Sequence, residues 1–142
     1  MQKVTTFLWF DNKAEEAMKF YVSIFKNSKI LGPMSFQIEG QEFIAFNGGP
    51  HFSFTPAISL FLNCESQEEV DEFWEKLSDG GEKSRCGWLK DKYGLSWQII
   101  PSILGKLMQD KDPQRSARVR TAMLAMDKID IEGLKRAYNN QA

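Results

Sequence analysis

The sequence predicts an α+β fold built from two βαβββ modules, followed by helices at the carboxyl end. The main observation is an internal repeat, in which residues 7–21 (FLWFDNKAEEAMKFY) match residues 60–74 (LFLNCESQEEVDEFW) at an offset of 53 residues. In both copies an alternating apolar run leads through a polar turn into a pattern of helical period. Beyond Pro101 the pattern is helical only. Each copy is too small to bury its own apolar face, so we expect the two copies to pack or pair.

The 142 residues fit a single domain, because a chain of this length can bury roughly two thirds of the surface that it exposes when unfolded. The repeat places module one at residues 1–50 and module two at residues 55–101. Residues 102–142 are then a C-terminal helical appendage, which has no counterpart in module one.

Module one begins with a strand over residues 4–10, which is rich in β-branched and aromatic side chains and ends at the turn-forming pair Asp11-Asn12. Asn12 with Glu15 three residues later is typical of a capping box, so a helix is predicted from here to about Asn27. Three short strands separated by glycine-containing turns complete the module, at residues 29–31, 35–39 and 42–46.

Module two repeats this order, starting with a strand over residues 57–63. Ser66 with Glu69 forms a second capping-box pattern, and the predicted helix ends at Gly80-Gly81, because glycine accepts the positive φ that often follows a helix. Two further strands are predicted at residues 85–89 and 95–100.

The appendage contains at least two predicted helices. Asp112 before Pro113 is typical of an N-cap with proline at the first helical position. Apolar residues then recur at helical spacing in two groups, first Val119, Met123, Met126 and Ile129, and then Ile131, Leu134 and Tyr138. We expect these helices to cover a sheet or a partner subunit.

The charge of the chain excludes some classes of partner. There are 18 basic and 19 acidic residues, which give a formal net charge of -1 and no general attraction to nucleic acid or to an anionic membrane. We expect the local basic cluster to be a solvated helical face; it comprises Lys111, Arg115, Arg118 and Arg120. The sequence thus predicts a protein that binds neither nucleic acid nor membrane.

Cysteine usage and the absence of targeting patterns indicate a cytoplasmic location. Cys64 and Cys86 are separated by 21 residues without CxxC spacing, which disfavours a disulfide scaffold and a zinc ribbon. The first ten residues lack the apolar core of a signal peptide, and no 18 apolar residues run together. We therefore expect a soluble, cytoplasmic protein with reduced thiols.

Three segments carry a resemblance to a known family: CGWLKDKYGLSWQIIP at residues 86–101, FIAFNGGP at residues 43–50, and the FLWFDNKAEEAMKFY opening. With the paired βαβββ order, the chain resembles the PhnB-like family, often labelled demethylubiquinone 3-methyltransferase-like. That family belongs to the vicinal oxygen chelate superfamily, with glyoxalase I and the bleomycin-resistance proteins. The resemblance covers essentially the whole chain and implies that the modules form a half-open barrel of mixed sheets.

The chain departs from the family pattern between residues 29 and 34. Leu31-Gly32-Pro33 joins two predicted strands where family members usually carry a longer loop. Either the loop is shortened or residues are absent from this version of the chain. Such loops often cover the cleft in this superfamily, so the sequence gives no support for a lid here.

The resemblance also implies where the superfamily's enzymes would hold a metal ion, in the first and last strand of each module. A divalent ion that holds two substrate oxygens needs histidine or carboxylate ligands at these positions. The four positions here fall near Thr5 or Thr6, Ile44 or Ala45, Ile58 or Ser59, and Gln98. Because none of these is a good ligand, we expect no metal and no cofactor. The single histidine, His51, lies in the linker between modules and is expected at the surface.

The aromatic content favours a ligand-binding cleft. Aromatic residues make up 13% of the chain, and many lie in predicted strands, where every second side chain shares a face. Core packing is the alternative role for each of them. The predicted cleft combines aromatic walls with a few polar groups, at Thr6, Trp9, Asn47, Ser59, Phe61, Trp88 and Gln98.

Three functions remain open, and the first is favoured. It is the binding of a small aromatic or apolar molecule without metal, as bleomycin-resistance proteins do by sequestration. The alternative is a divalent-metal-dependent lyase, isomerase or dioxygenase of the glyoxalase type, using His51 or Gln98. A third possibility is a role in assembly only, with the C-terminal helices as an interface, and a homodimer is expected in any case. A methyltransferase is disfavoured, because the sequence lacks the glycine-rich turn between strand and helix that would bind S-adenosylmethionine.

Overall fold

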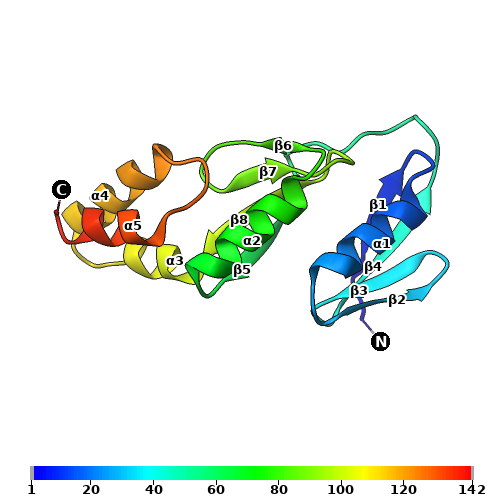
Figure 1. Cartoon of the computed structure of the whole chain (residues 1–142), viewed down its shortest axis with the longest axis horizontal. Helices are drawn as coiled ribbons and strands as arrows, with labels where there is room; N and C mark the ends of the chain where they lie inside the picture. Colours follow the sequence, from blue (N-terminus) through cyan, green and yellow to red (C-terminus); the bar gives the residue numbers. More distant parts are fainter. Residues whose placement is uncertain (1, 142) are drawn as a thin grey trace. The chain divides into compact units, whose positions relative to one another are not determined.

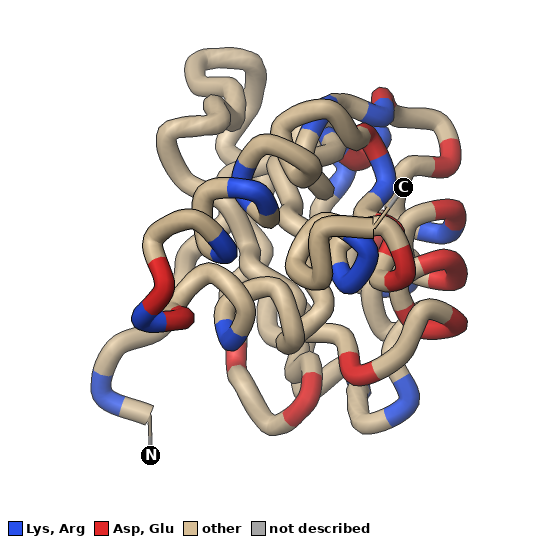
Figure 2. The backbone as a smooth tube through the Cα atoms, turned by 90° about the vertical axis from the view of Figure 1, so that its left-hand side faces the viewer, with Lys and Arg blue, Asp and Glu red and all other residues tan. Residues whose placement is uncertain are grey.

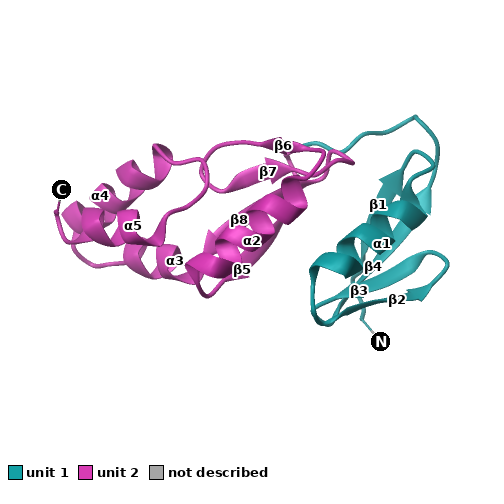
Figure 3. Ribbon diagram, viewed as in Figure 1, with its two compact units in different colours: residues 1–55 teal, residues 56–142 magenta. Residues whose placement is uncertain are grey.

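The computed structural model describes residues 2–141. The chain divides into two compact units, residues 1–55 and residues 56–142 (Figure 3). Unit 1 contains the first predicted module, and unit 2 contains the second module together with all the C-terminal helices (Figure 1). That the two units make one domain stays a prediction.

Unit 1 has the βαβββ order that the repeat predicts. Its four-stranded sheet has the order β1-β4-β3-β2, in which β1 and β4 are parallel and the other neighbours are antiparallel. The elements are β1 (Thr6–Phe10), α1 (Ala14–Ile24), β2 (Ser28–Gly32), β3 (Ser35–Ile38) and β4 (Gln41–Asn47).

Helix α1 lies against one face of this sheet (Figure 1). The side chains between them form the core of unit 1, because every second residue of a strand faces the helix. Burial of each large apolar side chain there stabilises the unit by roughly 1.5–3 kcal/mol. The buried residues of this core include Leu8, Phe10, Ala17, Met18, Tyr21, Phe36, Phe43 and Ala45.

The start of α1 differs from the prediction. Asn12 is not the N-cap: it has a φ of 60°, in the left-handed region, and the cap position is Lys13, whose side chain makes no capping bond. Instead, Oδ1 of Asn47 accepts a hydrogen bond of 2.8 Å from the backbone N–H of Ala14. Asn47 ends β4, which pairs with β1 in parallel, so the capping group comes from a residue far away in sequence.

The connection between β2 and β3 is a tight hairpin. Gly32 pairs with Ser35, so only Pro33 and Met34 lie between the paired residues. The turn is therefore too short to form a lid.

Unit 2 repeats the arrangement. Its sheet has the order β5-β8-β7-β6, in which β5 and β8 are parallel. Helix α2 covers one face of this sheet (Figure 1). Two central residues of β8, Trp97 and Ile99, are buried on this face. The elements are β5 (Ser59–Cys64), α2 (Gln67–Ser78), β6 (Glu82–Lys83), β7 (Trp88–Lys90) and β8 (Ser96–Pro101).

The capping box predicted for α2 is confirmed. Oγ of Ser66 accepts a hydrogen bond from the N–H of Glu69 at 3.2 Å. The Glu69 carboxylate in turn accepts a hydrogen bond of 2.7 Å from the backbone N–H of Glu65, the residue before the N-cap. Helix α2 thus has its predicted N-cap, whereas α1 is capped one residue later than predicted and by a different contact.

The strand predicted at residues 85–89 starts only at Trp88. Cys86 and Gly87 have φ values of 59° and 84°, which are incompatible with an extended strand. The short strand β6, which the sequence analysis did not predict, supplies the remaining pairing of β7.

The turn between β7 and β8 is organised by Asp91, whose side chain is only 2% exposed. Its Oδ1 accepts the backbone N–H of Tyr93 at 2.9 Å and of Leu95 at 3.1 Å. Its Oδ2 accepts the indole N–H of Trp97 at 3.0 Å. One buried carboxylate therefore satisfies three donors, one of which belongs to a core side chain.

The appendage consists of α3 (Ser102–Met108), α4 (Pro113–Leu124) and α5 (Ile131–Tyr138). The predicted cap of α4 is confirmed, since Oδ1 of Asp112 accepts the N–H of Gln114 at 2.9 Å. The predicted helical pattern extends beyond the helix itself. Helix α4 ends at Leu124, and Met126 and Ile129 lie in the connection to α5. The helices enclose a small core of Ile100, Leu104, Val119, Ile129 and Leu134.

Hydrogen bonds join the appendage to module two. The side chain of Gln67, at the start of α2, accepts the N–H of Ile131 at 2.8 Å and donates to the carbonyl of Ile129 at 3.0 Å. The N–H groups of Cys86 and Gly87 donate to carbonyls of the α4–α5 connection at 2.8 and 2.7 Å. The appendage is thus fixed to module two at several points.

The predicted α+β fold with two βαβββ modules is confirmed. Each sheet is an open, four-stranded mixed sheet with its helix on one face. The half-open barrel that would combine the two sheets stays a prediction.

Candidate functional site

A pocket of about 490 Å³ lies on unit 2, between its sheet and the appendage. We call it the sheet pocket. The strands β5, β7 and β8 contribute Phe61, Trp88 and Gln98. The helices contribute Gly105 and Met108 of α3 and Met123 of α4. The lining is mostly apolar and aromatic, with few polar groups, as is usual for small-molecule sites.

The floor of the sheet pocket is a row of three side chains on adjacent strands. Gln98 on β8 is paired directly with Phe61 on β5 and with Trp88 on β7. Directly paired residues project from the same face of a sheet, so the amide of Gln98 lies between two aromatic side chains. This face is the one opposite α2, because the neighbouring residues Trp97 and Ile99 are buried on the other face.

Ser59 fixes the amide of Gln98. The Nε2 of Gln98 donates a hydrogen bond of 3.1 Å to Oγ of Ser59, two residues before Phe61 on β5. With one amide proton engaged, the other proton and Oε1 are not used by this bond. Four predicted cleft residues, namely Ser59, Phe61, Trp88 and Gln98, thus lie together on one face of one sheet.

Ser96 is a polar group on this face that the sequence analysis did not select. It precedes Gln98 by two residues on β8 and is paired with Ser59, so the alternation of the strand places it on the same face. Its side chain is 1% exposed, and its hydroxyl is the only buried side-chain polar atom within residues 2–141 that lacks a hydrogen-bond partner. Strand alternation was the signal that could have found it.

Cys86 also lines the sheet pocket and is half-buried. Its left-handed backbone is held by the bond from its N–H to the carbonyl of Met126.

The three other predicted cleft residues lie in unit 1. Trp9 is held tightly: its indole N–H donates to the carbonyl of Gly49 at 3.0 Å, and its ring lies 5.3 Å from that of Phe46 and 4.8 Å from that of Phe52. A Cβ on Gly48 would lie only 2.1 Å from the Trp9 ring, so the close approach requires glycine. Trp9 is therefore a fixed aromatic side chain on the face of β1 opposite α1.

Thr6 and Asn47 are not grouped with Trp9. Thr6 is paired with Phe43 and shares a face of the sheet with Leu8 and other core residues, so it lies on the opposite side of β1 from Trp9. Asn47 caps α1 with its side-chain oxygen. The alternation of β1 separates Thr6 from Trp9, which the sequence analysis placed in one cleft.

The residues of the sheet pocket do not fit a divalent metal site. No three His, Cys, Asp or Glu side chains come close enough to share an ion anywhere in residues 2–141. The pocket offers the neutral amides of Gln98 and Gln109 and the thiol of Cys86, whereas a divalent ion that binds substrate oxygens needs histidine or carboxylate ligands. His51 is exposed in the linker, as the sequence analysis expected.

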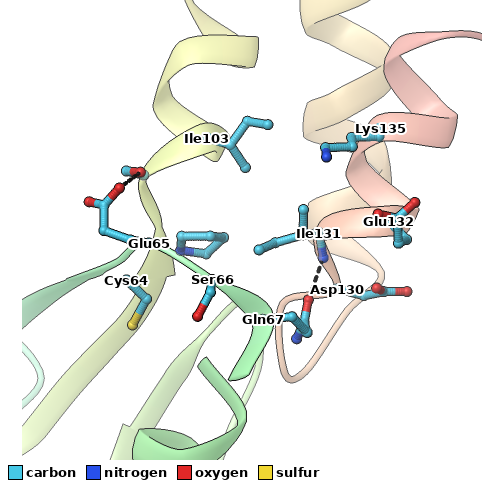
Figure 4. A pocket seen from close by; sticks show the side chains of 11 residues that line it. Cys64, Glu65, Ser66, Gln67, Ile103, Asp130, Ile131, Glu132 and Lys135 are labelled. Atoms are coloured by element: carbon cyan, nitrogen blue, oxygen red, sulfur yellow. Dashed lines mark hydrogen bonds between the residues drawn. The ribbon is translucent and has the colours of Figure 1, made fainter. Parts of the chain in front are cut away.

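A second, more polar pocket of about 330 Å³ lies where α2, α3 and α5 begin (Figure 4). Its side chains are already engaged with one another: Oγ of Ser102 donates to Glu65 at 3.1 Å, and Gln67 accepts the N–H of Ile131. Cys64 lies at its base and is fully buried. The engaged polar groups make this pocket a structural junction between module two and the appendage.

Burial, together with the nearby carboxylates of Glu69 and Glu65, raises the pKa of the Cys64 thiol to about 12. An unfolded thiol titrates near pH 8.5. Above about pH 9 the unfolded chain therefore loses a proton that the folded chain keeps, so the free energy of unfolding falls as pH rises toward 12. We expect this fall to be steeper for the native chain than for Cys64→Ala, as measured by urea unfolding at several pH values. Equal slopes would show that Cys64 keeps its ordinary pKa.

The basic cluster at residues 111–120 is only partly solvated. Arg118 donates from Nε and Nη2 to the carbonyls of Ala137 and Tyr138, both at 2.9 Å. Arg115 donates to the hydroxyl of Tyr138 at 3.2 Å, and that hydroxyl donates to Asp110 at 2.6 Å. Basic and acidic residues are interspersed over most of the sequence, although residues 43–64 contain none of either kind (Figure 2). Two of the arginines thus connect α4 to the end of α5.

The helices give no indication of a membrane span: within residues 2–141, none is both long and apolar enough to cross a bilayer.

Comparisons with known proteins agree with the fold. A family model described as 3-demethylubiquinone-9 3-methyltransferase matches residues 2–35 and 31–100, and the two matches meet in the β2–β3 hairpin, where the sequence departs from the family pattern. No curated protein matches the chain.

Several solved structures resemble the chain, among them the following two. A PhnB protein from Bacillus cereus, whose description names the same methyltransferase, is 40% identical, with a TM-score of 0.64; the match covers 71% of this chain and 100% of that one. A protein from Pseudomonas aeruginosa is 15% identical, with a TM-score of 0.56, and the match covers 70% of this chain and 96% of that one. The second likeness is one of fold alone.

Proposed function

Since the chain belongs to the PhnB-like family, which is described as 3-demethylubiquinone-9 3-methyltransferase, we propose that it binds a small, neutral, aromatic or apolar molecule in the sheet pocket without a metal ion. The observation that supports this most is the row of Phe61, Gln98 and Trp88 on three adjacent strands. Two aromatic side chains can pack against a planar or apolar molecule, and the amide between them can orient one polar group of it.

The charge of the pocket supports a neutral ligand. Its lining combines aromatic, aliphatic and thioether side chains with the amides of Gln98 and Gln109 and contains no charged residue. A charged ligand would lose its hydration without gaining an ion pair, which costs more than the apolar contacts return. The methyltransferase named by the family description is not part of the proposal, because neither sheet is the doubly wound sheet that S-adenosylmethionine enzymes use.

Binding without metal is proposed over the glyoxalase-type alternative because of the donor groups. Gln98, at the position where the superfamily's enzymes carry glutamate, is neutral and bonded to Ser59. A homodimer and a cytoplasmic location stay predictions, as does the absence of nucleic acid and membrane partners.

A titration with N-phenyl-1-naphthylamine, a neutral fluorescent probe, tests the proposal. We expect saturable binding to the native chain, with quenching of tryptophan fluorescence, because Trp88 lines the pocket. Truncation of Trp88 or of Phe61 to alanine should weaken binding by roughly tenfold or more, which corresponds to about 1.4 kcal/mol.

Two controls make the result specific. Ile30→Ala shortens a part-exposed apolar side chain on β2 and should leave the affinity unchanged. Addition of EDTA should also have no effect. Absence of saturable binding, or equal losses in Ile30→Ala and Phe61→Ala, would contradict the proposal, and loss of binding in EDTA would favour the metal-dependent alternative.

A further inference from the structure

The appendage lies outside the part of the chain that matches the family. The family model ends at residue 100, and the Bacillus cereus structure is covered in full by 71% of this chain. Helices α3, α4 and α5 begin at Ser102 and end at Tyr138. These helices are thus an addition to the family scaffold, yet two of them form one side of the sheet pocket.

This wall is a fixed part of unit 2. Its core includes Ile100 of β8 together with Leu104 of α3 and Val119 of α4, the last of which is fully buried. The bonds from Gln67 to the residues around the start of α5, at 2.8 and 3.0 Å, hold the far side of the appendage. A ligand in the sheet pocket would therefore meet a preformed wall, which costs little ordering on binding.

One residue of this wall, Gly105, has no side chain. Gly105 is exposed, and a Cβ built on it meets no atom within 4 Å, so a side chain here would extend into open space at the edge of the pocket. Gly105 lies within α3 and lines the sheet pocket. Its neighbours in the wall, Met108 and Met123, are flexible side chains that can adapt to different shapes.

From these contacts we infer that the appended helices, and Gly105 in particular, determine the size of the molecule that this chain accepts. The inference rests on the proposed function, because it concerns the same pocket. The family scaffold supplies the aromatic and amide floor, whereas α3 and α4 supply the wall that faces it. The missing side chain at Gly105 leaves the pocket open at this point, and the methionines form the neighbouring part of the wall.

The test is to fill this space and compare two neutral probes of different size. Gly105→Leu adds an apolar side chain where nothing obstructs it, and leucine suits the interior of a helix better than glycine does. We expect it to weaken N-phenyl-1-naphthylamine at least tenfold and naphthalene less than threefold, with a melting temperature no lower than that of the native chain. Affinities are measured by quenching of tryptophan fluorescence.

Lys106→Leu is the matched control, because it places the same side chain on the same helix at an exposed residue that does not line the pocket. It should leave both affinities unchanged. If Gly105→Leu weakens both probes equally, or neither, while Phe61→Ala still weakens binding, the appended wall does not select ligand size. The inference is then wrong, although the proposed function stands. If the native chain binds neither probe, the proposed function fails, and the inference with it.

Discussion

Replacement of Asp91 by alanine is expected to lower the free energy of unfolding of unit 2 by about 3 kcal/mol, because it leaves several buried donors without an acceptor. The carboxylate accepts the backbone N–H groups of Tyr93 and Leu95 and the indole N–H of Trp97. Asp91 and Trp97 are 2% and 3% exposed, so water does not replace the lost acceptor without a change in the structure. The effect therefore arises from desolvated donors and not from a lost surface charge.

Urea unfolding followed by far-ultraviolet circular dichroism measures this effect. Glu82→Ala, which removes an exposed carboxylate in the same unit, is the control and should change stability by less than about 0.5 kcal/mol. Asp91→Asn should fall between the two, since an amide oxygen can still accept hydrogen bonds. A loss for Asp91→Ala as small as that for Glu82→Ala would mean that the turn rearranges and satisfies the three donors elsewhere.

Replacement of Gly87 by alanine is expected to cost a similar amount, about 3 kcal/mol, from backbone strain and steric overlap together. Gly87 has a φ of 84°, which L-residues with a side chain rarely adopt. An added Cβ would also lie 2.8 Å from the carbonyl oxygen of Ile99 and 2.8 Å from Cδ1 of Ile100. These contacts press on β8 next to the sheet pocket, and the backbone oxygen cannot move without breaking the sheet.

Gly94→Ala separates the two causes. Gly94 has a φ of 87°, nearly the same as Gly87, but an added Cβ there meets nothing within 4 Å. We expect Gly94→Ala to cost only the conformational part, about 1 kcal/mol, in the same urea experiment. Equal losses in the two variants would show that the overlap at Gly87 is relieved by a small shift of the chain.

The sequence was sufficient to predict the strands and helices of the modules, because the patterns that identify them involve only neighbouring residues. The alternation of Phe7 to Phe10 and the helical spacing that follows are properties of neighbouring residues. The same is true of the Ser66–Glu69 capping box, which lies within one helical turn. Where the interaction is not local the prediction was wrong, as at the start of α1, which is capped by Asn47 from β4.

The site was predicted in part for the same reason. Ser59, Phe61, Trp88 and Gln98 do meet, because pairing of β5 and β7 with β8 brings them to one face. The helical wall of the pocket could not be predicted from the repeat, since α3 and α4 have no counterpart in module one. Strand alternation places Ser96 on the same face as Gln98, but the burial of its hydroxyl without a hydrogen-bond partner is seen only in the structure.

The bonds that Gln67 makes with the appendage have a consequence for the order in which the chain acquires structure during synthesis. The two bonds link residues that are separated by 62 and 64 positions in the sequence. The first turn of α2 therefore receives these partners only after residue 131 has left the ribosome. The sheet of unit 1, by contrast, is complete once β4 has emerged at Asn47. Since compact units fold as they become available, unit 1 can fold while most of unit 2 is still being translated. A ribosome that stalls between residues 101 and 131 would therefore hold a finished first module and a second one that exposes the surface meant for its last helices.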